Sequence, residues 1–266
     1  MRTPIARLAA LVSFALAACS GGDGPVAPDV PEVPEVPEVP GLPGGQTVSL
    51  DEVLNQLNTV GFYAGAGLVG LGVAPAPDAS MPSATACPYD ATTTYFVCPT
   101  QTADGLTINT RYQLLTSGGV PMAAFNSATV SSLRYVVDVE GAIDVGDGTS
   151  ISIDSHDEQT LSGLQTTTRV VNGTGTTDLS MTADGQTFAV ATTRAINNLV
   201  LPYEPGPNAY PASGSITTTA TADQVSFTST ITFHGTSTVT IVSTLNGSTQ
   251  SCTFNLATPE TPPVCS

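Results

Sequence analysis

Residues 225–256 read VSFTSTITFHGTSTVTIVSTLNGSTQSCTFNL, and apolar and polar side chains alternate through most of this stretch. Alternation with a period of two places the apolar side chains on one face of a β-strand and the polar ones on the other. Asn246-Gly247 interrupts the pattern and supplies the positive φ that a two-residue hairpin turn requires, and His234-Gly235 is expected to do the same. The stretch therefore predicts antiparallel strands with one buried face and one Thr-rich, exposed face. The side chains expected on the buried face are Val225, Phe227, Ile231, Phe233, Val239, Ile241, Leu245, Cys252, Phe254 and Leu256.

The same pattern extends toward the N-terminus. Asp104-Gly105, Asn172-Gly173 and Asp184-Gly185 each lie between strand-like runs and are predicted to be hairpin turns. We predict a mainly β fold, in which an antiparallel meander forms a soluble barrel, a half-barrel or a sandwich. One short N-terminal helix is expected, because Ser49 and Glu52 form a capping box and leucines follow at helical spacing. The predicted strands are 92–99, 106–115, 132–140, 149–155, 160–171, 176–183, 186–195, 214–222, 224–233, 236–245 and 248–256.

Composition excludes several classes of function. The chain has 266 residues, with 6 Lys+Arg against 22 Asp+Glu and a net charge of −16. A protein this acidic repels phosphate backbones, so we expect no nucleic-acid partner. Thr occurs 40 times, which favours strands over helix interiors. Because the chain has no Lys it cannot contain the usual phosphate-binding loop, and no dinucleotide fingerprint is present, so no cofactor is expected.

The first residues have the features of an export signal. Arg2 and Arg7 precede an almost wholly apolar run, 8–18, that is too short to span a bilayer as a stable helix. The run ends in Leu16-Ala17-Ala18-Cys19, which resembles the lipobox of bacterial lipoproteins. This resemblance implies a signal peptide over 1–18, cleavage before Cys19 and acylation of Cys19, which would anchor the protein to a membrane. The resemblance also implies sorting to the outer membrane, on its periplasmic or surface face, because the residue after the cysteine is Ser20 rather than Asp.

Residues 19–46 are predicted to be the lipidated cysteine followed by a disordered or extended Pro-rich stalk. Proline recurs at every third position from Pro25 to Pro43, which matches the three residues per turn of polyproline II. At ~3.1 Å per residue this rod would reach about 56 Å. A Pro-rich peptide ligand for a partner protein is the alternative. The remainder, 47–266, is predicted to be a single β-rich domain.

Four cysteines follow Cys19. An even number in an exported protein predicts disulfides, and we favour Cys87–Cys98 and Cys252–Cys265, because each pair encloses a short loop. A zinc site is the alternative, but such sites usually contain one tighter cysteine pair than these spacings provide.

Two clusters are candidates for chemistry. Asp138, Glu140, Asp144 and Asp147 lie around a predicted turn and form a weak Ca²⁺ candidate, although no EF-hand pattern is present. The second cluster, 156–158, places His156 beside two carboxylates, and we interpret it as a charged turn, because no nucleophile elbow accompanies it. No catalytic residue and no metal ligand is therefore assigned. The four arginines of the domain are expected on exposed strand faces; they are Arg111, Arg134, Arg169 and Arg194.

These observations favour a lipid-anchored envelope lipoprotein whose β-domain has a non-enzymatic role in binding or in envelope structure. The alternative is a carrier that holds a small apolar ligand inside a barrel or half-barrel. A third and weaker alternative is an envelope hydrolase, which would require His156, a serine and an acid to converge in a cleft.

Overall fold

The computed structural model describes residues 87–266, except 104, 147, 184, 203–209, 223–224, 259–260 and 262. The signal peptide, the stalk and the helix predicted from the capping box all lie outside the described residues. No helix that is long and apolar enough to cross a membrane occurs in the part of the chain that the structure describes.

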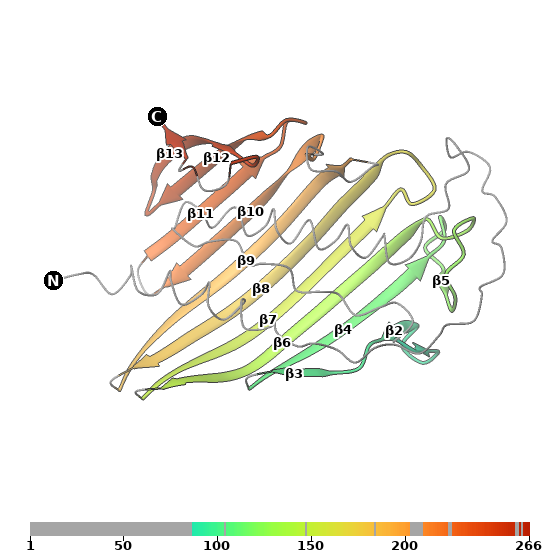
Figure 1. The fold of residues 1–266 in the computed structure, drawn as a ribbon, viewed down its shortest axis with the longest axis horizontal. Coiled ribbons are helices and arrows are strands. Elements are labelled where there is room, and N and C mark those ends of the chain that lie inside the picture. The colour runs from blue at the N-terminus through green and yellow to red at the C-terminus, as the bar shows by residue number, and fades with distance from the viewer. Residues whose placement is uncertain are drawn as a thin grey trace.

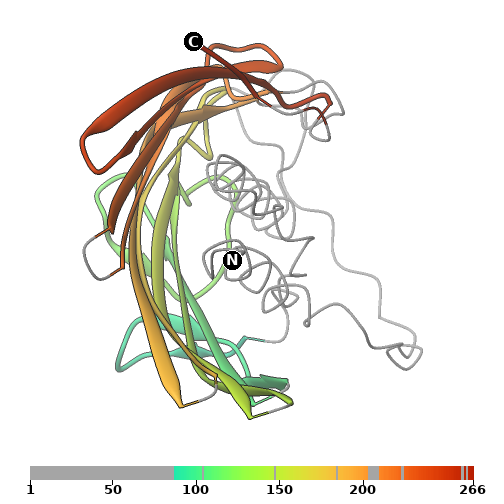
Figure 2. The same ribbon diagram turned by 90° about the vertical axis from the view of Figure 1, so that its left-hand side faces the viewer.

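The described residues form one antiparallel sheet of 14 strands and contain no helix (Figure 1). The strand order is β1-β2-β4-β6-β7-β8-β9-β10-β11-β12-β13-β14, while β3 and β5 pair with β4, and the sheet is not closed within the described elements. Figure 2 shows that the sheet is strongly curved. Its strands are β1 Tyr89–Asp90, β2 Tyr95–Val97, β3 Gln101–Ala103, β4 Leu106–Leu115, β5 Pro121–Met122, β6 Ser132–Gly146, β7 Thr149–Ser162, β8 Arg169–Ala183, β9 Gln186–Leu201, β10 Ser213–Ala222, β11 Val225–Thr232, β12 Thr238–Leu245, β13 Ser248–Asn255 and β14 Val264–Cys265.

The mainly β, antiparallel prediction is confirmed, and several strands agree closely with it. The strand expected at 106–115 is β4, and the hairpin turn at Asn246-Gly247 has φ values of 48° and 85°. Gly105, Gly185 and Gly235 also take positive φ between strands, as their turn positions predicted. Local turn chemistry and alternation are enough to specify these hairpins.

The prediction was wrong in the middle of the sheet. The strand expected at 149–155 continues to Ser162 as one long β7, and the strand expected at 160–171 does not form: it is divided among the end of β7, a loop at 163–168 and the start of β8. The predicted turn at Asn172-Gly173 lies inside β8, at a β-bulge where the Asn172 side-chain oxygen accepts a hydrogen bond from the backbone N–H of Asn198 (2.8 Å). Strand pairing on both sides of β8 therefore overrides the local turn signal.

The two faces of the sheet differ sharply. One face, which we call the core face, carries a register row of buried aliphatic side chains that runs across five strands: Leu114, Leu133, Leu161, Val171 and Leu199. The other, outer face carries many threonines, some of which bond to one another across strands, as in Thr217–Thr230 (3.0 Å) and Thr244–Thr249 (2.9 Å). Burial of the core-face side chains drives the packing of this sheet.

Disulfides lie near both ends of the sheet. Cys87 is bonded to Cys98, beside β1 and β2, and Cys252 of β13 is bonded to Cys265 of β14. These are the two pairs that the sequence spacing favoured.

Candidate functional site

A band of polar side chains crosses the core face, where the sequence predicts apolar ones. The register places Asp157 of β7 opposite Gly175 of β8, and Gly175 opposite Arg194 of β9. The same row continues into Thr218 of β10 and Ser229 of β11, which are buried. We call this row the polar belt. Polar side chains inside a core require partners, so the belt calls for a physical explanation.

An ion pair that crosses β8 is the centre of the polar belt. The guanidinium Nη2 of Arg194 donates to Oδ1 of Asp157 over 2.5 Å, although the two residues lie on strands that do not pair with each other. The pair passes over Gly175, where a Cβ would lie 1.8 Å from Asp157 Oδ1. The glycine thus provides the space that the ion pair occupies, a role of strand glycines where another group approaches the backbone closely.

Gln159 extends the polar belt by one register row. Its side chain lies over Gly173, where a Cβ would come within 3.0 Å of Gln159 Cγ. The Gln159 residue is 8% exposed, and its Oε1 has no hydrogen-bond partner. The Nε of Arg194 is also buried and has no partner. The belt therefore contains one unused acceptor and one unused donor, and each such buried group is costly unless something satisfies it.

The ion pair is not fully enclosed. The Asp157 side chain is 30% exposed and that of Arg194 is 21% exposed. Burial raises the pKa of the Asp157 carboxyl above its ordinary value, although the charge of Arg194 acts in the opposite direction. The two charged side chains of the belt are thus partly buried and partly in contact with solvent.

Beyond the polar belt the core face becomes apolar again, toward the tips of the β6–β7 and β8–β9 hairpins. Register rows place these apolar side chains together across β4, β6, β7, β8 and β9. Most are only half-buried, in contrast to the main core, although Leu106 and Ile151 are buried. We call this region the tip strip; it consists of Leu106, Ile143, Ile151, Ile153, Leu179, Met181, Phe188 and Val190.

The interpretation of 156–158 as a charged turn was wrong. These residues lie within β7, so Asp157 faces the core side, whereas His156 and Glu158 face the outer side. The strand tolerates this run of charge because arginines on other strands pair with two of its three members: Arg134 of the neighbouring β6 with Glu158, and Arg194 of β9, across β8, with Asp157.

The outer face carries a small charged network. Asp138 of β6 accepts hydrogen bonds from Arg111 (2.5 Å) and from the Nδ1 side of the His156 ring (2.6 Å). Burial raises the pKa of Asp138, but the hydrogen bonds from His156 and Arg111 outweigh this and hold the pKa below its ordinary value. Arg134 donates two hydrogen bonds, of 2.8 and 2.7 Å, to the carboxylate of Glu158, and these lower the pKa of Glu158.

The arginine prediction holds for only two of the four residues. Arg111 and Arg134 lie on the outer face, as expected. Arg194 instead belongs to the polar belt, and Arg169, which shares the core face with Val171, is only 1% exposed. Alternation alone could not reveal this, because the partner of Arg194 lies 37 residues away in the chain.

The candidate calcium ligands do not come together in a metal site among the described residues. Asp138, Glu140 and Asp144 alternate along the outer face of β6, and Asp147 lies outside the described residues. Asp138 is already bound by Arg111, and Asp144 accepts a hydrogen bond from the backbone N–H of Gly146. Among the residues that the structure describes, no cluster of three potential metal ligands occurs.

The hydrolase geometry is also incomplete. The His156 side chain is 47% exposed on the sheet surface, and Asp138 orients it. Within the described part of the chain no serine hydroxyl is hydrogen-bonded to the ring. His234 lies in the loop between β11 and β12, and its Nε2 is 3.1 Å from the hydroxyl oxygen of Thr240 in β12.

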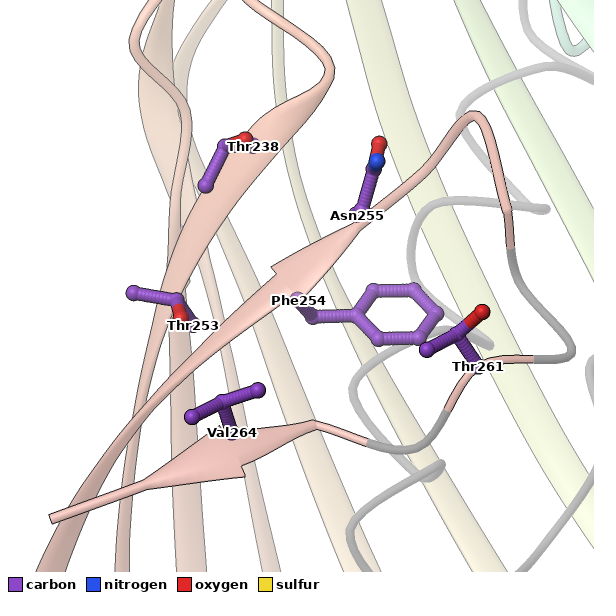
Figure 3. A pocket seen from close by; sticks show the side chains of 6 residues that line it. All are labelled: Thr238, Thr253, Phe254, Asn255, Thr261 and Val264. Carbon is purple, nitrogen blue, oxygen red and sulfur yellow. The ribbon is translucent and has the colours of Figure 1, made fainter.

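A hollow beside the second disulfide is too small for an ordinary ligand. It has a volume of about 150 Å³ and lies between β13 and β14, where Figure 3 shows the ring of Phe254 directed toward Thr261. Ligand pockets usually measure ~300–1,000 Å³. The polar belt and the tip strip are therefore the stronger candidates.

Sequence reasoning missed the residues of the polar belt, but one signal was present. Residues 172–175 read NGTG, with glycine at two alternate positions on the same strand face. Alternate glycines on one face indicate close approach of neighbouring groups, whereas we interpreted the first one as a turn. No protein-family model, no curated protein and no solved structure matches this chain.

Proposed function

We propose that this protein is a lipid-anchored envelope lipoprotein whose β-domain has a non-enzymatic role in binding or in envelope structure. The N-terminal sequence supports the anchor, because Leu16-Ala17-Ala18-Cys19 ends an apolar run of export-signal length. Two or three acyl chains on Cys19 would anchor stably where one would not. The Pro-rich stalk would then hold the domain away from the outer membrane.

The non-enzymatic role is supported chiefly by the ion pairs that the titratable side chains form. Asp138, Asp157 and Glu158 each pair with an arginine on another strand. Groups committed to cross-strand ion pairs stabilise the sheet, whereas a catalytic acid or base must face a substrate. The ring of His156, which Asp138 orients, is 47% exposed on the outer face of the sheet.

A half-barrel is the form of the domain that we infer among the three expected from sequence. The strong curvature of the open sheet supports it (Figure 2). The core face would then be the inner surface of the half-barrel.

A second candidate function is the carriage of a small apolar ligand. The tip strip favours it, because its side chains remain half-buried although those of the main core are almost completely buried. An apolar patch that stays partly exposed on a sheet face is a candidate interaction surface.

Intact-mass measurement of the native protein tests the anchor. We expect a chain that begins at Cys19 and carries the mass of a diacylglycerol and a further acyl group. Cys19→Ala should abolish this mass and release the protein from the membrane fraction. An unmodified chain that begins elsewhere would refute the proposal.

A further inference from the structure

The main core is enclosed more completely than a single sheet can enclose its own face. Neighbouring side chains on a sheet face shield one another's flanks, but their outer ends stay in solvent unless a second layer lies over them. On the core face, the row from Leu114 to Leu199 has 0% exposure at all five positions. A second row continues it across β9 to β12 with exposures of 1–2%, and consists of Ile196, Ile216, Ile231 and Ile241. A second layer must therefore cover this part of the core face.

The loops that the structure describes do not form this layer by themselves. Each of them joins strands at their ends and contributes one or two apolar side chains to the core, such as Phe125, Leu164 and Phe233. Such side chains close the ends of the rows, whereas rows that cross eight strands, from β4 to β12, need a continuous cover. The covering layer must therefore include residues outside the described part of the chain.

One segment ahead of Cys87 has the composition of such a layer. Its first part carries apolar side chains at helical spacing, which would form one face of a helix: Leu50, Val53, Leu54 and Leu57. Its second part, 60–74, contains no charged side chain. The stalk before it is rich in proline and acids, which do not suit an apolar core. Residues 50–74 are therefore the part of the preceding chain that fits the core face.

The length of this segment and the point where it joins the domain agree with that position. The buried rows cross seven strand spacings, or about 34 Å at ~4.8 Å each. Residues 50–74 would span about 37 Å even as one continuous helix, at ~1.5 Å per residue. Cys87 is bonded to Cys98 beside β2, near the β4 end of the rows. The 12 residues between 74 and 87 extend to at most ~40 Å, so they can reach Cys87 from any position along the rows.

The pattern of burial also shows where the cover ends. Leu179, Met181 and Phe188 of the tip strip are only half-buried, although they lie on β8 and β9 and on the same face as the buried rows. The second layer therefore lies over the half of the sheet that holds Leu161 and Leu199, and it does not extend past the polar belt over the tip strip.

We propose that residues 50–74 form a second layer that packs on the core face along the rows from Leu114 to Ile241 and leaves the tip strip uncovered. A segment of the same chain has an advantage over a separate occupant, because a short connector holds it at an effective concentration on the order of millimolar. The inference goes beyond the proposed function and does not require the anchor at Cys19. It confines any carried ligand to the tip strip.

Paired substitutions in the mature protein test the cover. Leu54→Ala removes an apolar side chain from the proposed contact, and it should lower the urea midpoint of the β-sheet circular dichroism signal by roughly 1–2 M. Gln56→Ala lies on the opposite side of the expected helix and should leave the midpoint unchanged. Both replacements introduce alanine into the expected helix, so helix propensity differs little between them.

Photo-cross-linking identifies what lies against the segment without depending on stability. Benzoylphenylalanine in place of Leu57 should cross-link within one chain to residues of the buried rows, such as Leu161 or Ile216, as mapped by peptide mass spectrometry. The same group in place of Asn55, on the other side of the expected helix, should give no cross-link to these rows.

Several results would overturn the inference. A Leu54→Ala midpoint equal to that of the parent would show that the segment does not pack on the sheet. Cross-links that join two chains would assign the cover to a second copy. Cross-links from position 57 that avoid the core face would exclude the segment, and a ligand retained in the native mass spectrum would then account for the burial. If Leu54→Ala does not fold, the cross-links decide, and the mass of the Cys19 terminus tests the anchor separately in every case.

Discussion

Replacement of Gly175 by Ala tests whether this glycine exists to make room for the ion pair. The new Cβ would lie 1.8 Å from Oδ1 and 2.9 Å from Cγ of Asp157, so the carboxylate must swing away from Arg194. A hydrogen bond between charged groups contributes ~1.5–3 kcal/mol. Solvent recovers part of this, because the Asp157 side chain is 30% exposed.

The expected net loss in the free energy of unfolding is about 1–2 kcal/mol. Alanine also restricts the unfolded chain relative to glycine, which returns ~0.4–1 kcal/mol to the variant. In a urea titration this would lower the midpoint by roughly 0.5–1 M, for slopes of about 2 kcal/mol per molar. Circular dichroism in the β-sheet region is a suitable readout.

The same substitution in a protein that lacks the Asp157 carboxylate identifies the cause of the loss. In Asp157→Ala the obstructing carboxylate is absent, so adding Gly175→Ala should be neutral or stabilising by up to ~1 kcal/mol. Equal losses in the two backgrounds would refute the reasoning, because the glycine would then be needed for its backbone conformation rather than for the space above it.

The remaining predictions concern acid stability, the C-terminal disulfide and the core. Asp138 and Glu158 have folded-state pKa values below their ordinary ones, so they bind fewer protons when folded, and the stability they contribute is lost as pH falls below about 4. The pKa of Asp157 is raised and acts in the opposite sense, so Asp157→Asn should steepen the acid loss seen by chemical denaturation at pH 3 to 6. Cys265→Ser opens a loop with a sequence separation of 13 and should cost about 3 kcal/mol relative to the oxidised parent, measured by the urea midpoint. The fully reduced parent loses the Cys87–Cys98 bond as well, so its midpoint should be lower still. Leu161→Ala, at a side chain with 0% exposure, should cost ~2–5 kcal/mol, and a loss below 1 kcal/mol would contradict its place in the core.

The C-terminal half of the sheet could be predicted from sequence because its information is local. The strand pair β12–β13 is specified by alternating side chains and by Asn246-Gly247, all within 18 residues, and the register joins Leu245 to Ser248 around the turn. Turn chemistry and strand period agree there, so no distant residue is needed to decide the structure.

The centre of the sheet could not be predicted in the same way. A charge at Asp157 inside a strand is unfavourable unless Arg194 pairs with it across β8. That partner lies 37 residues away, so the sequence around Asp157 does not indicate it. Gly173 and Gly175 were equally ambiguous, because glycine serves both turns and close approaches. Only the pairing of β7, β8 and β9 decides which role applies.

The two-residue strands that end the sheet have a consequence for behaviour at high local concentration. A long exposed strand is a template for pairing with another molecule, and copies held on one membrane by the proposed lipid anchor would meet edge to edge. Here the outermost strands, β1 and β14, span only Tyr89–Asp90 and Val264–Cys265, and a disulfide lies beside each. The pairs formed by β14 reach only Cys252 and Thr253 of β13, so reduction of this bond would free one side of an eight-residue strand. On this reasoning the Cys252–Cys265 disulfide would oppose edge-to-edge pairing of neighbouring copies, because it holds β14 against part of β13.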